Sequence, residues 1–216
     1  MASRPVEEFL GIDSICESPR FSSPDDFGLN DAKMNEMKAK ILLADPNCRK
    51  IKDNLYSVEP TEDGENVLFE VKKLSTMTQI VYYVSFQLEK LSLLPRESIT
   101  QVALWKSLLS SNDASDRFWK YIFPKTGLAV SDRVQTEKGR KFWLYLVDQA
   151  SKRGVYPYLL DFRRKRIIDL DEGVDSFFKL SNTAYSDYAE TEQFRWCLSK
   201  DKLTKSVPAS KIAKLS

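Results

Sequence analysis

Two helical segments that alternate with strand-like runs place the strongest constraint on how this chain can fold. Apolar residues recur at helical spacing in residues 112–127 and again in residues 137–153. Short apolar runs precede, separate and follow the two helices, in residues 98–107, 128–132 and 155–162. A helix between two strands of one sheet is a crossover connection, so at least one pair of strands must be parallel. The sequence therefore predicts a mixed α+β fold.

The part of the chain before these helices predicts an antiparallel meander. Four strand-like runs are rich in β-branched and aromatic residues: residues 54–60, 65–74, 78–88 and 98–107. Turn-forming residues separate these runs. Connections this short join antiparallel neighbours. We expect a central mixed sheet in which antiparallel N-terminal strands lead into a strand–helix–strand–helix–strand run, with helices on both faces.

One more helix is predicted before the first strand. Apolar residues fall at helical spacing after Asn30 and Asp31, either of which can cap the helix: Met34, Met37, Ile41 and Leu42. Near the other end of the chain, patterns predict strands in residues 166–170 and 193–199 and a short helix in residues 174–180.

The two ends of the chain differ in composition from its middle. Residues 1–30 hold six acids, two bases and three of the nine prolines, which predicts an irregular lead-in. Residues 200–216 hold five lysines and one aspartate, which predicts a basic flexible tail. We expect a single domain between them, in residues 31–199.

Composition excludes several kinds of chemistry. The 216 residues include no histidine, which removes Ser-His-Asp and Cys-His nucleophiles and histidine-ligated metals, and we expect no metal. Three cysteines without CxxC spacing suit a reducing compartment. No apolar run approaches the roughly 18 residues that a membrane span needs. We expect a protein of the cytoplasm, or of a host's cytoplasm, that does not bind a membrane.

The order of these elements carries a family resemblance. The stretches "SITQVALWKS", "DRFWKYIF" and "LAVSD", followed by the helix of residues 137–153, are similar to the fourth strand, third helix, fifth strand and fourth helix of the GNAT acyltransferase superfold. The similarity covers residues 67–199, and "SDRVQTEKGRKFWLYL" resembles GNAT-like proteins of phages and bacterial mobile elements. The resemblance implies that acetyl-CoA or another acyl-CoA lies where the fourth and fifth strands splay apart, with its diphosphate on the amides at the start of the third helix.

The resemblance also implies where the site residues lie. The cofactor-binding set follows the fourth strand and the starts of the two helices: Trp105, Lys106, Ser110, Ser111, Asn112, Ser115 and Gly139. Ser131 and Asp132 end the fifth strand at the rim of the groove, and Asp132 or Glu70 would take the proton of an acceptor amine. Asp132 could instead cap the helix that follows it.

Several positions depart from the family's pattern. The stretch "LLSSNDAS" has no glycine where the family's phosphate loop has them, and Asp113 and Asp116 put negative charge at the start of the helix. Ala150 stands where a catalytic tyrosine is common, and the fourth strand has no glutamate.

Three functions therefore stay open at the level of sequence. The first is a divergent acyltransferase that uses acyl-CoA on an unknown acceptor. The second is a non-catalytic GNAT-like scaffold that binds a host or partner protein, as a phage or pathogen modulator would. The third, and the weakest, is a nucleic-acid-associated protein that uses the basic run Arg163–Arg166 and the lysine tail. A basic run between strands is more often a solvated turn.

Overall fold

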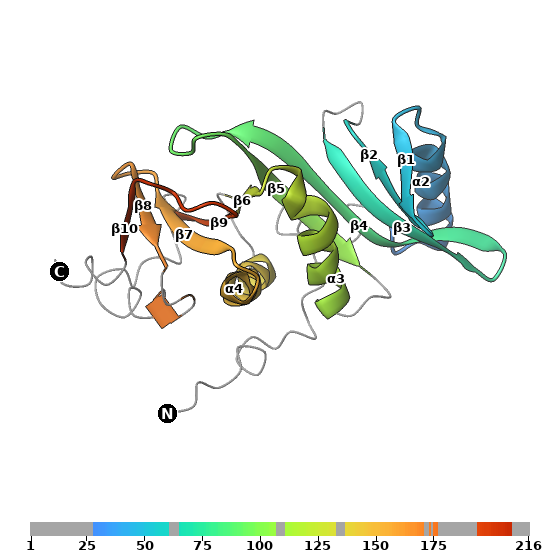
Figure 1. Cartoon of the computed structure of the whole chain (residues 1–216). Helices are drawn as coiled ribbons and strands as arrows, with labels where there is room; N and C mark the ends of the chain where they lie inside the picture. Colours follow the sequence, from blue (N-terminus) through green and yellow to red (C-terminus); the bar gives the residue numbers. More distant parts are fainter. Residues whose placement is uncertain are drawn as a thin grey trace.

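One mixed sheet organises the molecule (Figure 1). The computed structural model describes residues 28–60, 65–106, 111–132, 137–170, 173, 175–176 and 194–208. Within these residues ten strands form a single sheet in the order β1-β2-β3-β4-β5-β6-β9-β7-β8-β10. The predicted mixed α+β class is confirmed. Most of the predicted lead-in and of the short helix at 174–180 lies outside the described residues.

The first half of the sheet is an antiparallel meander. Its strands are β1 (Cys48–Lys52), β2 (Leu55–Val58), β3 (Asn66–Leu74), β4 (Met77–Lys90) and β5 (Glu97–Lys106). The sequence predicted four of these strands but not β1. The residues of β1 are mostly charged and exposed, so no apolar pattern marks this edge strand.

The second half of the sheet is built through two crossover connections, one before and one after its first strand. It contains β6 (Leu128–Val130), β7 (Tyr156–Asp161), β8 (Arg166–Asp169), β9 (Phe194–Ser199) and β10 (Ser206–Pro208). β6, β9, β7 and β8 are antiparallel neighbours in that order, and β10 runs parallel to β8. β10 lies inside the segment that was expected to be a flexible tail.

A short parallel seam joins the two halves. In the described part of the chain, β5 and β6 are parallel and pair at a single position, Ile99 with Ala129. This is the parallel pair that the crossover connections predicted. Beyond it Ser131 exchanges hydrogen bonds with Trp196, so the chain after β6 follows β9 and not β5.

Helices cover both faces of the sheet, as predicted. They are α2 (Ala32–Ala44), α3 (Ser111–Arg117) with its extensions η3 (Phe118–Ile122) and η4 (Phe123–Lys125), and α4 (Glu137–Lys152). Alternate residues of β3 point to opposite faces: Phe69 packs in the cluster under α2, whereas Leu68 packs in the cluster formed by α3, η3 and α4. Figure 1 shows α3 and α4 together at the middle of the sheet and α2 at its β1 end.

The predicted helix at residues 112–127 changes its winding partway along. Its α-helical part ends at Arg117, and η3 is a π-helix in which the Phe123 N–H bonds to the Phe118 carbonyl. This i to i+5 spacing accommodates Phe118 and Phe123, which are both buried and whose rings are 6.1 Å apart. Trp119 is also buried.

The helix predicted after Asp31 is α2, but only one of its four predicted apolar positions, Leu42, lies on the buried face. Asp31 caps it by accepting bonds from the N–H groups of Lys33 and Met34. The buried residues are Asn35, Ala39 and Leu42. The other predicted positions form an exposed stripe: Met34, Met37 and Ile41.

Candidate functional site

The ends of β5 and β6 hold four of the candidate site residues that the sequence singled out. Trp105 and Lys106 end β5, where their backbones pair with Tyr83 and Tyr82 of β4. Ser131 and Asp132 follow β6 directly. Because β5 and β6 run parallel, these carboxyl ends lie at the same edge of the sheet.

The helices α3 and α4 begin after the ends of β5 and β6, and they hold further candidate residues. Ser111, Asn112 and Ser115 belong to α3, with Ser115 fully buried, and Gly139 is a buried residue in the first turn of α4. Ser110 lies outside the described residues. The α-helical part of α3 has seven residues with Asp113 in its first turn, which weakens the dipole argument for a diphosphate there.

Ser131 holds two strands together. Its Oγ accepts a hydrogen bond of 3.0 Å from the Trp196 N–H, and its own N–H donates to the Trp196 carbonyl at 2.9 Å. The residue is completely buried. Its hydroxyl therefore satisfies the backbone of β9, and the partly buried Asp132 is the next polar side chain along the rim.

Glu70 lies in a cross-strand row with another predicted residue. The row runs Leu55, Glu70, Tyr82, Lys106 across β2, β3, β4 and β5. Neighbouring strands lie about 4.8 Å apart, so the backbones of Glu70 and Lys106 are separated by about two strand spacings. The fold thus brings a catalytic candidate and a cofactor-binding candidate into one row.

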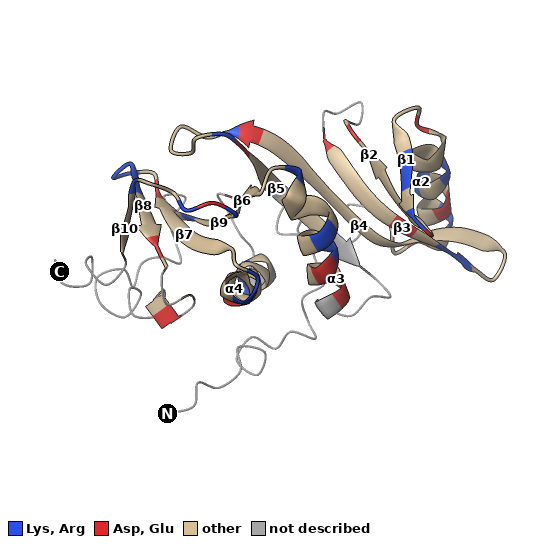
Figure 2. Cartoon of the chain, in the orientation of Figure 1, with Lys and Arg blue, Asp and Glu red and all other residues tan. Residues whose placement is uncertain are grey.

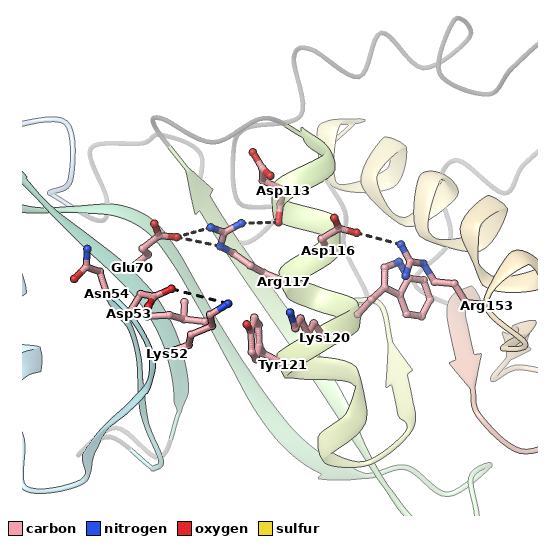
Figure 3. A pocket seen from close by; sticks show the side chains of 12 residues that line it. Lys52, Asp53, Asn54, Glu70, Asp113, Asp116, Arg117, Lys120, Tyr121 and Arg153 are labelled. Carbon is pink, nitrogen blue, oxygen red and sulfur yellow. Dashed lines mark hydrogen bonds and ion pairs between the residues drawn. The ribbon is translucent and has the colours of Figure 1, made fainter.

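An arginine that the sequence analysis did not single out fixes Glu70 (Figure 3). Arg117 of α3 donates two bonds to Glu70 Oε2, at 2.5 Å from its terminal nitrogen and 3.2 Å from Nε. A third bond joins Arg117 to the Asp113 carbonyl at 3.0 Å. With Glu70 committed in this way, it is a poor choice for a general base.

The same guanidinium lies over the ring of Tyr82, 5.4 Å from its centroid. Burial raises the pKa of the Tyr82 hydroxyl well above its ordinary value of 10. The positive charge of Arg117 lowers this pKa and the negative charge of Glu70 raises it, but burial has the largest effect. The Tyr82 phenol therefore stays neutral over the physiological pH range.

Glu70 and Arg117 line a pocket of about 630 Å³ between the β1–β2 turn and α3. Among the described residues that line it, cations and acids are equal in number: Lys52, Arg117, Lys120 and Arg153 against Asp53, Glu70, Asp113 and Asp116. Glu70 pairs with Arg117, and Asp116 pairs with Arg153 at 3.1 Å (Figure 3). The pocket is polar, and its charges neutralise one another.

The basic run Arg163–Arg166 forms the turn between β7 and β8 (Figure 2). The buried carboxylate of Asp161 organises it, accepting from the Arg164 N–H at 2.9 Å and from Arg166 Nε at 3.0 Å. Arg163 and Arg164 are exposed, as expected of a solvated turn.

The described part of the chain holds neither a metal-binding cluster nor a membrane-spanning helix. No group of three or more His, Cys, Asp or Glu side chains there is placed to hold a metal ion. Nor does that part contain a helix with the length and apolar character that crossing a membrane requires.

Comparison with known proteins adds no relative. No family model matches the chain, and neither a curated protein nor a solved structure matches it.

Proposed function

We propose that this chain is a divergent GNAT-like acyltransferase that transfers an acyl group from acetyl-CoA or another acyl-CoA to an amine. The observation that carries the proposal is the seam between β5 and β6. An antiparallel meander ends in β5, β5 is parallel to β6, and β6 is followed in the sheet by the antiparallel β9 and β7. α3 and α4 form the two crossovers.

The short pairing at this seam is the physical reason for a ligand there. β5 continues seven residues beyond Ile99, to Lys106, whereas β6 ends at Val130, one residue beyond Ala129. In the described chain, no residue of β6 pairs with β5 beyond Ile99. Backbone N–H and C=O groups require partners, and an extended ligand that carries amides can supply them as an added strand would. The pantetheine arm of an acyl-CoA has this character.

The chemistry requires few protein groups. The acceptor amine attacks the thioester carbonyl carbon, the carbon–sulfur bond breaks, and the thiolate of coenzyme A leaves and takes up a proton. The ammonium formed on the acceptor loses its proton to a base. Since Glu70 is bound to Arg117 and the Ser131 hydroxyl to the Trp196 N–H, we assign the base to Asp132 at the rim.

Binding and turnover test this proposal separately. At a concentration one hundred times its dissociation constant, acetyl-CoA should stabilise the protein by about 2.7 kcal/mol, which thermal unfolding measures. Release of free thiol from acetyl-CoA, followed with a panel of amines, reports turnover. Asp132→Asn should keep the stabilisation and lower kcat by about 10²-fold, whereas Asp148→Asn on α4 should change neither.

No stabilisation by millimolar acetyl-CoA, together with no thiol release, would overturn the proposal. If Asp132→Asn and Asp148→Asn both lost turnover and kept binding, the assignment of Asp132 as the base would be overturned. The acyltransferase proposal itself would stand.

A second candidate, the non-catalytic scaffold, is favoured by one observation. Met34, Met37 and Ile41 on α2 are 52%, 56% and 63% exposed, an apolar stripe of the kind that a partner protein covers. Coenzyme A binding without turnover for any amine, together with partner binding that Ile41→Lys abolishes, would favour this candidate.

A further inference from the structure

We infer that a second groove, at the opposite edge of the sheet from the acyl-CoA site proposed above, binds a small phosphomonoester that carries an apolar group. The groove has a volume of about 550 Å³. It is lined where β5, β6 and β7 begin and β9 ends, by Arg96, Gly127, Val155 and Lys200 among others. These four chain segments meet there because β5, β6 and β7 share one direction and β9 runs the other way.

The groove differs from the pocket beside α3 in its charge. Among its described lining residues, four are cations and one is an acid: Arg96, Lys125, Arg153 and Lys200 against Asp201. The pocket beside α3 has equal numbers of both. A groove with one dominant sign of charge attracts a ligand of the other sign, so the expected ligand is an anion.

Gly127 brings two of these cations together. Its φ is +64°, and a Cβ at this position would lie 3.2 Å from Lys200 Cβ and 3.4 Å from a terminal nitrogen of Arg96. The Lys200 N–H donates to the Gly127 carbonyl at 2.8 Å, which fixes the backbone that carries Lys200. Two cationic side chains from different segments thus flank one glycine. A phosphate between them would accept charge-assisted hydrogen bonds from both.

The cations differ in how far they are already neutralised. Arg96 pairs with Asp201 at 2.9 Å, Arg153 with Asp116 at 3.1 Å, and Lys125 with Glu59. Within the described residues, the ammonium group of Lys200 makes no ion pair. Lys200 is therefore the cation that a phosphate would engage without breaking an existing pair, and Asp201 is the group that would compete with it for Arg96.

Apolar residues line the groove beside its cations, which is why we expect more than a bare phosphate. Trp119, Phe123 and Val155 line it and are 8%, 5% and 8% exposed. The indole N–H of Trp119 already donates to Gln149 at 2.8 Å, and the Arg153 guanidinium lies over the ring, 5.4 Å from its centroid. Trp119 therefore offers a ligand no free donor, and only the apolar ring surface that Arg153 leaves uncovered. A ring or alkyl group attached to the phosphate would bury this surface.

Isothermal titration at low salt with three probes tests the inference: phenyl phosphate, inorganic phosphate and phenol. We expect phenyl phosphate to bind more tightly than inorganic phosphate, and phenol not to bind measurably. Lys200→Gln should weaken phenyl phosphate about tenfold or more, because a charge-assisted hydrogen bond is lost. Asp201→Asn should strengthen it, because Arg96 is released and a repelling charge is removed. The control is Lys73→Gln, an exposed lysine at the end of β3 away from the groove, which should leave binding unchanged.

Equal affinities for phenyl phosphate and inorganic phosphate would overturn the inference. So would equal weakening by Lys73→Gln and Lys200→Gln, or weaker binding in Asp201→Asn. Stabilisation by acetyl-CoA should be unchanged in Lys200→Gln, so the failure of this inference and the failure of the acyltransferase proposal are distinguishable.

Discussion

Single buried polar residues connect parts of this fold that are distant in sequence. Asn35 is 2% exposed, and its amide bonds to both main-chain groups of Ile80: Nδ2 donates to the carbonyl at 3.1 Å and Oδ1 accepts from the N–H at 2.6 Å. Nδ2 also donates to the Leu29 carbonyl at 2.9 Å. One side chain thus fixes α2 on β4.

Asn35→Ala should lower the free energy of unfolding by about 2–4 kcal/mol, because buried main-chain groups of Ile80 and Leu29 lose their partners. Urea unfolding measures this loss. Asn47→Ala is the matched control: the Asn47 amide also bonds to a main-chain carbonyl, that of Pro60, but in an exposed position. Its cost should stay below about 1 kcal/mol. Equal costs for the two variants would contradict the role given to Asn35.

Tyr158 makes stability depend on alkaline pH. It is fully buried, its hydroxyl accepts a bond from the Leu203 N–H at 3.0 Å, and burial raises its pKa from 10 to about 12. The unfolded chain releases this proton near pH 10 while the folded protein retains it to about pH 12. The unfolded state then holds fewer protons, so stability falls as pH rises across this window and is fully present below it.

Tyr158→Phe should reduce the fall in stability between pH 10 and 12 while costing about 1 kcal/mol at neutral pH through the lost hydrogen bond. Thermal unfolding at several pH values measures both effects. A variant whose stability falls as steeply as that of the wild type would show that Tyr158 does not hold its proton in the folded state.

At the scale of elements, the C-terminal strand belongs to the fold. β10 pairs with β8 at three positions, and Leu203, just before it, is 7% exposed in the cluster with Leu91 and Tyr158. Deleting residues 200–216 should therefore lower stability by at least about 2–3 kcal/mol, the worth of one buried leucine and more.

Deleting residues 209–216 leaves every contact described here in place and provides the control. Calorimetry of the two truncated chains compares them. Equal melting temperatures would restore the expectation of a flexible tail from residue 200 onward.

The sequence predicted elements well where their pattern is local and poorly where a distant partner creates them. α4 and β4 have long apolar periods, and the structure has them almost as predicted. β10 has three residues and exists through its pairing with β8, which no local period reveals. On α2 the buried face includes the polar Asn35, so of the predicted apolar positions only Leu42 lies on it and the other three are exposed.

The candidate site shows the same limit. The order of elements was enough to predict a parallel pair and to place Ser131 and Asp132 at its end. Glu70 and Arg117 are 47 positions apart, so their pairing arises only when α3 packs over β3. A glutamate inside the otherwise apolar stretch "VLFEV" was the one sign that a cation must lie nearby.

For the whole molecule, the decisive feature is how two half-sheets stay together when their strands barely pair. β5 and β6 share one ladder position in the described chain, so packing must supply the rest. The largest cluster of buried residues includes Leu68 and Val84 from the first half and Leu159 and Leu198 from the second. η3, η4 and α4 contribute aromatic residues between them.

Phe118 lies at the centre of that packing. Its ring centroid is 6.2 to 6.4 Å from those of Trp143 and Phe142 on α4, in edge-to-face geometry, and it is 1% exposed. It therefore joins the crossover that leaves β5 to the crossover that leaves β6. Loss of the Phe118 side chain would therefore weaken the packing of both halves of the sheet.

Phe118→Ala should lower the free energy of unfolding by about 3–5 kcal/mol through the cavity it leaves. Tryptophan fluorescence in urea measures this, because Trp143 lies in the same cluster. Leu88→Ala, at a 43% exposed position on β4, is the control and should cost less than about 1 kcal/mol. If the seam depends on this packing, Phe118→Ala should also weaken acetyl-CoA binding while Leu88→Ala does not. Unchanged binding in a destabilised but folded Phe118→Ala protein would show that the ends of β5 and β6 are held in place without the aromatic cluster.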